Sequence, residues 1–157
     1  MLILASQSPR RKELLGLLNM PFTVRVADID EAMDPAKPVS DEVARVSLAK
    51  AMAVPRSPED VVIAADTVVV LDHAVLGKPA DEAEARDMLR RLSGRSHQVM
   101  TGVTVLQGEK SLSHTEVTEV IFRKLTEQEI CRYVATGEPM DKAGAYGIQG
   151  GAALFCE

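Results

Sequence analysis

The first eighteen residues constrain the fold most, because the chain passes there from a strand to a helix with almost no connecting loop. Residues 2–4 form an apolar run typical of a buried strand, and the leucines of residues 14–18 form a stripe typical of a helix. Between them, Ser8 has the chemistry of an N-cap and Pro9 that of a first helical position. We therefore expect a strand followed directly by a helix, as in α/β folds.

The expected helix start carries an unusual set of charges. Arg10, Arg11 and Lys12 follow Pro9, whereas the positive end of a helix dipole favours acidic residues. Free backbone N–H groups, the Ser8 hydroxyl and guanidinium groups together are typical of a phosphate site. The alternative is a solvated basic turn, and the Gly-rich P-loop pattern is absent from the sequence. The placement between strand and helix favours the phosphate site.

The rest of the chain continues to alternate between strands and helices. We expect strands at residues 22–27, 61–71, 74–76, 98–106 and 115–122, with an acidic loop at residues 28–38. Further helices should begin at Ser40, Asp81 and Thr126, and the last two should end at Gly94 and Gly137. This order predicts an α/β domain with a mixed sheet, parallel at its start and antiparallel at its hairpins.

Composition excludes several classes of protein. A chain of 157 residues with 46% hydrophobic content is long enough for one domain with a substantial core. A net charge of −5 and an aromatic content of 3% argue against nucleic acid as a partner. The apolar runs are too short to span a membrane, and we expect no signal peptide. Two cysteines fit a reducing, cytoplasmic setting.

Asp66 is the most informative single residue, because it interrupts a long apolar strand. The run of residues 61–71 is otherwise built from Val, Ile, Ala, Leu and one threonine, Thr67. A buried carboxylate is costly, so such groups are normally paired, bound to metal or functional. A metal ligand or general base is one interpretation, and a structural Asp bonded to backbone at a bulge is the other.

Three other charged residues are ambiguous by themselves. Lys50 lies in an otherwise apolar helical segment, where snorkelling to solvent is the ordinary explanation. Lys78, between Gly77 and Pro79, faces either a cleft or solvent, and Glu31 belongs to an acidic loop that solvation alone would explain. Together with the basic helix start and the buried acid, however, these residues suit metal-assisted chemistry on a polyphosphate.

Four motifs give the chain a specific family resemblance. Residues 5–11 (ASQSPRR), 64–68 (AADTV), 76–79 (LGKP) and 141–150 (DKAGAYGIQG) resemble the Maf family, in the same order and over almost the whole chain. The resemblance implies a two-lobed α/β fold with a mixed sheet and flanking helices, of the inosine-triphosphate-pyrophosphatase type. It also implies hydrolysis of nucleoside triphosphates to the monophosphate and pyrophosphate.

The same resemblance assigns roles to particular positions. Asp66 falls on the proton-acceptor position and shares with Glu31 the binding of a divalent cation, Mg²⁺ or Mn²⁺. Phosphate contacts are implied for Ser6, Arg11, Lys50 and Lys78. The residues that mark the branch acting on dTTP and UTP, with modified pyrimidine nucleotides as further candidates, are Arg10, Thr67 and Gln149.

The resemblance also has implications for the domain organisation and the biological role of the protein. It implies one Maf-like domain over residues 1–157, without the C-terminal strand and helix with which the family usually continues. It further implies a role in nucleotide-pool cleansing and division arrest, and allows a homodimer. The alternative is a non-catalytic nucleotide-binding regulator of septum formation, and a nucleotidyl or sugar-phosphate transferase comes third. Retention of Asp66, Glu31 and both lysines favours the enzyme.

Overall fold

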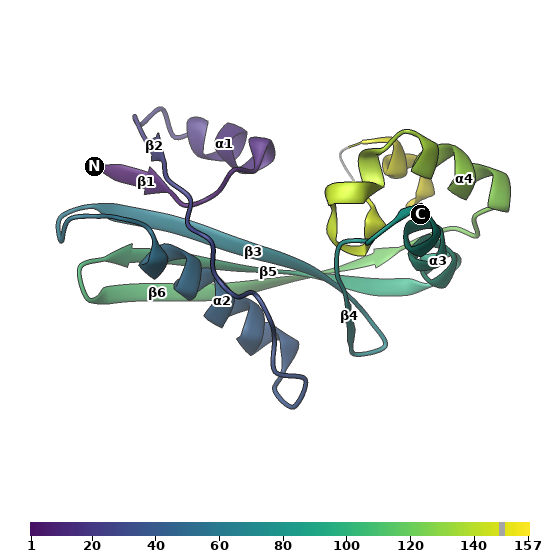
Figure 1. The fold of residues 1–157 in the computed structure, drawn as a ribbon, viewed down its shortest axis with the longest axis horizontal. Helices are drawn as coiled ribbons and strands as arrows, with labels where there is room; N and C mark the ends of the chain where they lie inside the picture. Colours follow the sequence, from purple (N-terminus) through teal and green to yellow (C-terminus); the bar gives the residue numbers. More distant parts are fainter. Residues whose placement is uncertain (148–149) are drawn as a thin grey trace. The chain divides into compact units, whose positions relative to one another are not determined.

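The computed structural model, which describes residues 1–147 and 150–157, contains a six-stranded mixed sheet (Figure 1). Strand β1 (Leu2–Leu4) lies between β2 (Thr23–Val24) and β3 (Val61–Leu71) and runs parallel to both. Strand β4 (Ala74–Leu76) pairs with β3 in the antiparallel sense. The order continues from β3 through β5 (Ser96–Gln107) to β6 (Lys110–Ile121). The predicted combination of parallel and antiparallel pairing is confirmed.

Four α-helices accompany the sheet in the described residues: α1 (Pro9–Gly16), α2 (Val39–Ala53), α3 (Glu82–Leu92) and α4 (Glu127–Ala135). Their starts follow the predicted chemistry in three cases. The Ser8 hydroxyl accepts the N–H of Arg11 at 3.3 Å and caps α1, and Asp81 caps α3 in the same manner. Helix α4 begins with a complete capping box formed by Thr126 and Glu129. Short 3₁₀ turns follow it at Glu138–Asp141, Ala143–Ala145 and Gly151–Phe155.

Three predicted boundaries were wrong: strand β6 begins at Lys110 and not at residue 115, and the start of α2 and the length of β2 differ for local reasons. Helix α2 begins at Val39 with Pro38 at its N-cap, so Ser40 lies inside the first turn. The fixed φ of proline suits this position. Strand β2 is two residues long, not six, because its described partner is the three-residue strand β1, which pairs with it only through Ile3 and Leu4. A strand can extend its ladder only as far as a neighbour supplies hydrogen bonds.

The chain divides into two compact units, each with its own apolar core. Unit 1 comprises residues 1–66 and 101–116, and unit 2 comprises residues 67–100 and 117–157. The core of unit 1 packs β1 and β3 against the end of α2, with Ile3, Ala51, Val54 and Val62 among its buried residues. The core of unit 2 gathers side chains from β3 and β4, from α3 and α4, and from the 3₁₀ turns.

Helix α2 is held on strand β5 in unit 1 by two features. A Cβ on Gly102 of β5 would lie 2.4 Å from the carbonyl oxygen of Val43, so the strand passes the helix backbone at very short range. Beside this contact, the buried hydroxyls of Ser47 and Thr104 are 2.6 Å apart, and the Thr104 hydroxyl also lies 2.7 Å from that of Ser113 on β6.

Within the described residues, no helix combines the length and apolar character needed to cross a bilayer.

Candidate functional site

The site is built around Asp66, which lies within strand β3 and is 8% exposed. The strand buries this side chain because its neighbours Ala64, Ala65 and Val68 belong to the apolar interior. Its carboxylate is not unpaired: Oδ1 lies 3.0 Å from Nζ of Lys50 on helix α2. The prediction that a carboxylate is buried within this strand is confirmed.

Lys50 joins two acidic residues that are distant in sequence. Its Nζ lies 2.7 Å from Oε1 of Glu31 and 3.0 Å from Oδ1 of Asp66, and it also donates to the carbonyl oxygen of Ala65 at 3.5 Å. The Lys50 side chain is 19% exposed. Snorkelling to solvent is therefore the wrong interpretation of this lysine, because the ammonium turns to the carboxylates and not to water.

Arg11 and Ser6 occupy the next positions around Asp66. The Arg11 guanidinium donates through Nη1 to the Ala65 carbonyl at 3.0 Å and to the Ser6 hydroxyl at 3.4 Å. Ser6 is buried, and its hydroxyl also accepts the N–H of Ser8, the cap residue of α1. The loop between β1 and α1 thus brings a guanidinium and a hydroxyl to the same stretch of β3 that carries the buried acid.

The electrostatics of this cluster follow from burial opposed by neighbouring charges. Burial raises the pKa of the Asp66 carboxyl above its usual value, and the Lys50 ammonium opposes that rise. Burial lowers the pKa of Arg11, and the carboxylates of Asp66 and Glu31 oppose that change. A carboxylate with a raised pKa is a stronger base than an exposed one, which suits proton abstraction from water.

The two carboxylates fit a divalent cation bound together with a substrate. In the described part of the chain, no group of three or more His, Cys, Asp or Glu side chains could hold a metal ion alone. Glu31 and Asp66 nevertheless both contact one cationic nitrogen, the Lys50 ammonium. Mg²⁺ is commonly bound by one or two carboxylates with water and substrate phosphates completing its shell. The donor set therefore fits Mg²⁺ or Mn²⁺ arriving with a polyphosphate.

Four further residues were predicted to belong to the site: Arg10, Thr67, Lys78 and Gln149. Arg10 is exposed, and its Nη1 lies 3.5 Å from Oε2 of Glu13 on the same helix. Thr67 and the exposed Lys78 belong to unit 2. Gln149 lies outside the described residues. The substrate roles of these four residues stay predictions.

Glycines on either side of residues 148–149 donate hydrogen bonds to a tyrosine and a glutamate of unit 2. The N–H of Gly147 donates to the Tyr133 hydroxyl at 3.1 Å, and the N–H of Gly151 donates to Oε2 of Glu138 at 3.3 Å. Tyr133 in turn donates to Oε1 of Glu138 at 3.1 Å. A Cβ on Gly150 would lie 1.8 Å from that same Oε1, so a larger residue here would displace the Glu138 carboxylate.

Sequence reasoning missed Glu42 and Arg45 on helix α2. Glu42 is only 3% exposed, and its Oε2 accepts Nε of Arg45 at 2.9 Å. The i, i+3 spacing of a glutamate and an arginine in an expected helix was visible, but such pairs are common on solvated faces. What distinguishes this pair is its contact with the loop backbone at residues 32–34. A helical pattern in the sequence does not indicate that contact.

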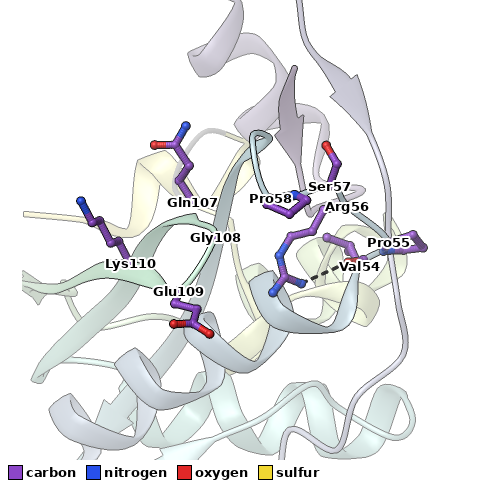
Figure 2. Close-up of a pocket in the computed structure, with 9 residues that line it drawn as sticks. All are labelled: Val54, Pro55, Arg56, Ser57, Pro58, Gln107, Gly108, Glu109 and Lys110. Atoms are coloured by element: carbon purple, nitrogen blue, oxygen red, sulfur yellow. Dashed lines mark hydrogen bonds between the residues drawn. The ribbon is translucent and has the colours of Figure 1, made fainter.

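An open groove elsewhere in unit 1 is separate from the cluster. Figure 2 shows its lining, which comes from residues 54–58 after α2 and residues 107–110 at the turn between β5 and β6. Arg56 is turned back onto its own segment, where Nη1 donates to the carbonyls of Met52 and Val54. These nine lining residues include none of the predicted site residues.

Comparison with known proteins gives the chain relatives of similar sequence and structures of similar fold. A dTTP/UTP pyrophosphatase of Bacillus cytotoxicus is 51% identical over 156 residues, covering 99% of this chain and 82% of that protein. One of Symbiobacterium thermophilum is 56% identical over 155 residues, covering 98% and 80%. A Ham1 protein from Coxiella burnetii superimposes with a TM-score of 0.56 at 17% identity, over 98% of this chain and 90% of that one.

A second solved structure agrees on the fold. The Ham1 protein of Staphylococcus aureus gives a TM-score of 0.53 at 15% identity, over 77% of this chain and 71% of that one. At such identities the likeness concerns the fold alone, and it confirms the α/β fold class predicted from the sequence. The family described as Maf-like protein matches residues 1–157. This chain therefore belongs to the Maf-like protein family.

Proposed function

We propose that this protein hydrolyses nucleoside triphosphates, dTTP and UTP foremost, to the nucleoside monophosphate and pyrophosphate. Support comes from relatives about half identical to this chain that are named dTTP/UTP pyrophosphatases. The observation that carries the chemistry is the buried Asp66 carboxylate, which contacts the Lys50 ammonium shared with Glu31, while Arg11 bonds the adjacent Ala65 carbonyl. A protein that only bound nucleotide would have no need of such a base.

Asp66 is the group we assign to activate water. In this step, the water oxygen forms a bond to the α-phosphorus while its proton passes to the Asp66 carboxylate. The bond between the α-phosphorus and the bridging oxygen breaks, and pyrophosphate leaves with the electron pair. The raised pKa of Asp66 favours proton acceptance.

Arg11 and Lys50 are the cations we assign to the phosphates. Phosphoryl transfer spreads charge over several oxygens, so fixed positive groups stabilise the transition state more than they stabilise the substrate. Arg11 presents a guanidinium that is already oriented by the Ala65 carbonyl and the Ser6 hydroxyl. Such preorientation lowers the cost of aligning the group during the reaction.

Glu31 and Asp66 would hold the divalent cation, Mg²⁺ or Mn²⁺. When bound, the cation supplies charge neutralisation to the triphosphate oxygens. Lys50 contacts both carboxylates, so its ammonium is the protein group most directly affected by a cation on them. Its four-carbon side chain gives the ammonium enough freedom to turn toward phosphate oxygens.

The products of the first turnover test this proposal. With UTP or dTTP and Mg²⁺, we expect nucleoside monophosphate and pyrophosphate in equal amounts, because the proposed attack is on the α-phosphorus. Separate assays for pyrophosphate and for orthophosphate, with no added pyrophosphatase, measure this directly. Orthophosphate and nucleoside diphosphate as first products would contradict the proposal. Tight binding without any turnover would support a non-catalytic regulator.

Gln149 is the residue we assign to base selection, on the resemblance of its motif. An amide both donates and accepts, which suits a pyrimidine edge carrying a carbonyl beside an N–H. Replacing Gln149 with Glu adds a charge and removes the donor, so we expect kcat/KM for UTP and dTTP to fall about tenfold or more relative to CTP and GTP. Steady-state kinetics with the four nucleotides measure the ranking.

Gln128→Glu supplies the matched control, because it makes the same change at an exposed position of α4 in the same unit. This control should leave the ranking of nucleotides unchanged. An unchanged ranking in Gln149→Glu as well would show that Gln149 does not contact the base.

We also place the reaction in the cytoplasm, with support from Cys131 and Cys156, which form no disulfide. A homodimer and a role in nucleotide-pool cleansing and division arrest stay predictions.

A further inference from the structure

The acidic loop before α2 contacts the Glu42–Arg45 ion pair of that helix, in addition to the Glu31–Lys50 pair of the cluster around Asp66. Glu42 is almost completely buried, and burial alone would destabilise its carboxylate. Its Oε1 accepts the N–H of Asp34 at 2.7 Å, and its Oε2 accepts Nε of Arg45 at 2.9 Å. A buried carboxylate is stable only when its oxygens find such partners. Here one of the partners is the loop backbone.

Arg45 completes the attachment from the other side. Its Nη2 donates to the carbonyl oxygen of Ala32 at 2.9 Å and also approaches Oε1 of Glu42 at 3.4 Å. The loop is therefore held at two points, the carbonyl of Ala32 and the N–H of Asp34. Arg45 and the Asp34 N–H together hold the pKa of Glu42 below its usual value, so the pair stays charged at neutral pH.

The attachment points are adjacent to a residue of the candidate site. Glu31 directly precedes Ala32, and Oε1 of Glu31 reaches the Lys50 ammonium at 2.7 Å. Lys50 lies on α2, the same helix that carries Glu42 and Arg45. The Glu31 side chain is 54% exposed, so its own packing does little to fix it. Its position therefore depends on the Lys50 ammonium and on how the loop backbone is held.

We infer that the Glu42–Arg45 pair positions Glu31, by holding the backbone of residues 32–34 on the helix that also carries Lys50. Neither member of the pair is required to contact substrate, and both are positioning residues. The inference rests on the proposed function only in its kinetic consequence. Its structural part, that this pair orders the loop, can be tested independently of turnover.

The first test measures the order of the loop by hydrogen exchange with mass spectrometry. Arg45→Met removes one partner of the buried Glu42 carboxylate but leaves its bond to the Asp34 N–H, so we expect a destabilised but folded protein, with thermal unfolding as the check. We expect amides in residues 30–36 to exchange about tenfold faster in this variant, since one of the two attachment points is lost. Arg90→Met is the matched control: Arg90 pairs with Glu127 through two nitrogens and is 45% exposed, but belongs to unit 2.

The second test is a double-mutant cycle with Glu31, measured on UTP with Mg²⁺. Displacing a reacting or positioning group by about 1 Å can cost about a hundredfold. Because Glu42 keeps its bond to the Asp34 N–H, we expect Arg45→Met to lower kcat/KM by about tenfold. In a Glu31→Gln background the same substitution should cost less than about twofold, since the group it positions is already gone. Arg45→Lys, which keeps the charge, should recover part of the loss.

The outcomes separate this inference from the proposed function. Unchanged exchange in residues 30–36 of Arg45→Met would overturn the inference, whatever the kinetics show. An equal loss of kcat/KM with and without Glu31, or full activity of Glu31→Gln alone, would overturn it too. If the wild-type protein turned over no nucleotide, the proposed function would fail. The exchange measurement would still decide whether the pair holds the loop.

Discussion

Replacing Asp66 with Asn should lower kcat by at least about a hundredfold, the lower part of the range for losing a general base. The amide preserves the size of the side chain but can neither accept a proton from water nor carry a negative charge. Lys50 would retain its contact with Glu31, and a neutral amide is easier to bury than a carboxylate. We therefore expect the melting temperature to change little. Initial rates with UTP and thermal unfolding by circular dichroism measure the two effects.

Asp60→Asn is the control for this substitution. Asp60 directly precedes β3 and is also buried, but its partners are the N-terminal amine and the N–H of Ser57. Losing its charge should change stability without changing the rate per folded molecule. A folded Asp66→Asn protein with near-normal kcat would remove Asp66 from the reaction and leave it a purely structural acid.

Replacing Gly102 with Ala should destabilise unit 1 by at least about 3 kcal/mol, the upper part of the range for overpacking. The new Cβ would lie 2.4 Å from the carbonyl oxygen of Val43, and 2.8 Å from the nitrogen of Ala44. Backbone atoms of a helix cannot rotate aside as a side chain can, so α2 would have to move away from β5. Urea unfolding followed by circular dichroism gives the change in free energy.

Gly16→Ala is the matched control, because a Cβ at Gly16, the last residue of α1, would have no atom within 4 Å. Alanine is the better helix former, so this variant should be as stable as the wild type or slightly more stable. If Gly102→Ala unfolded at the same urea concentration as the wild type, the short distance between β5 and α2 would be disproved.

Local chemistry predicted the elements well where it acts over a few residues. Ser8, Asp81 and Thr126 each accept a backbone N–H of the helix that follows, as their positions before helical stripes indicate. The β-branched run of residues 61–71 is strand β3 with the same bounds. The short length of β2 could not be predicted, because it depends on how much of β1 is available to pair with it.

The site was predictable as a set of residue types and only partly as a geometry. A carboxylate within an apolar strand indicates a partner, but the sequence does not say that the partner is Lys50, sixteen residues earlier on a helix. Lys50 alone fits snorkelling, and Glu31 alone fits a solvated loop. Only the packing of α2 on the sheet brings these two charges together. The role inferred for the Glu42–Arg45 pair could not be predicted either, because it also depends on packing between the loop and α2.

The cluster around Asp66 contains two carboxylates, Asp66 and Glu31, and two cationic side chains, Lys50 and Arg11, so its formal charges cancel. In a protein of net charge −5, such a cluster exerts little long-range attraction on a polyanion. Capture of a nucleotide would then depend on contacts made after it arrives and not on electrostatic steering toward the site.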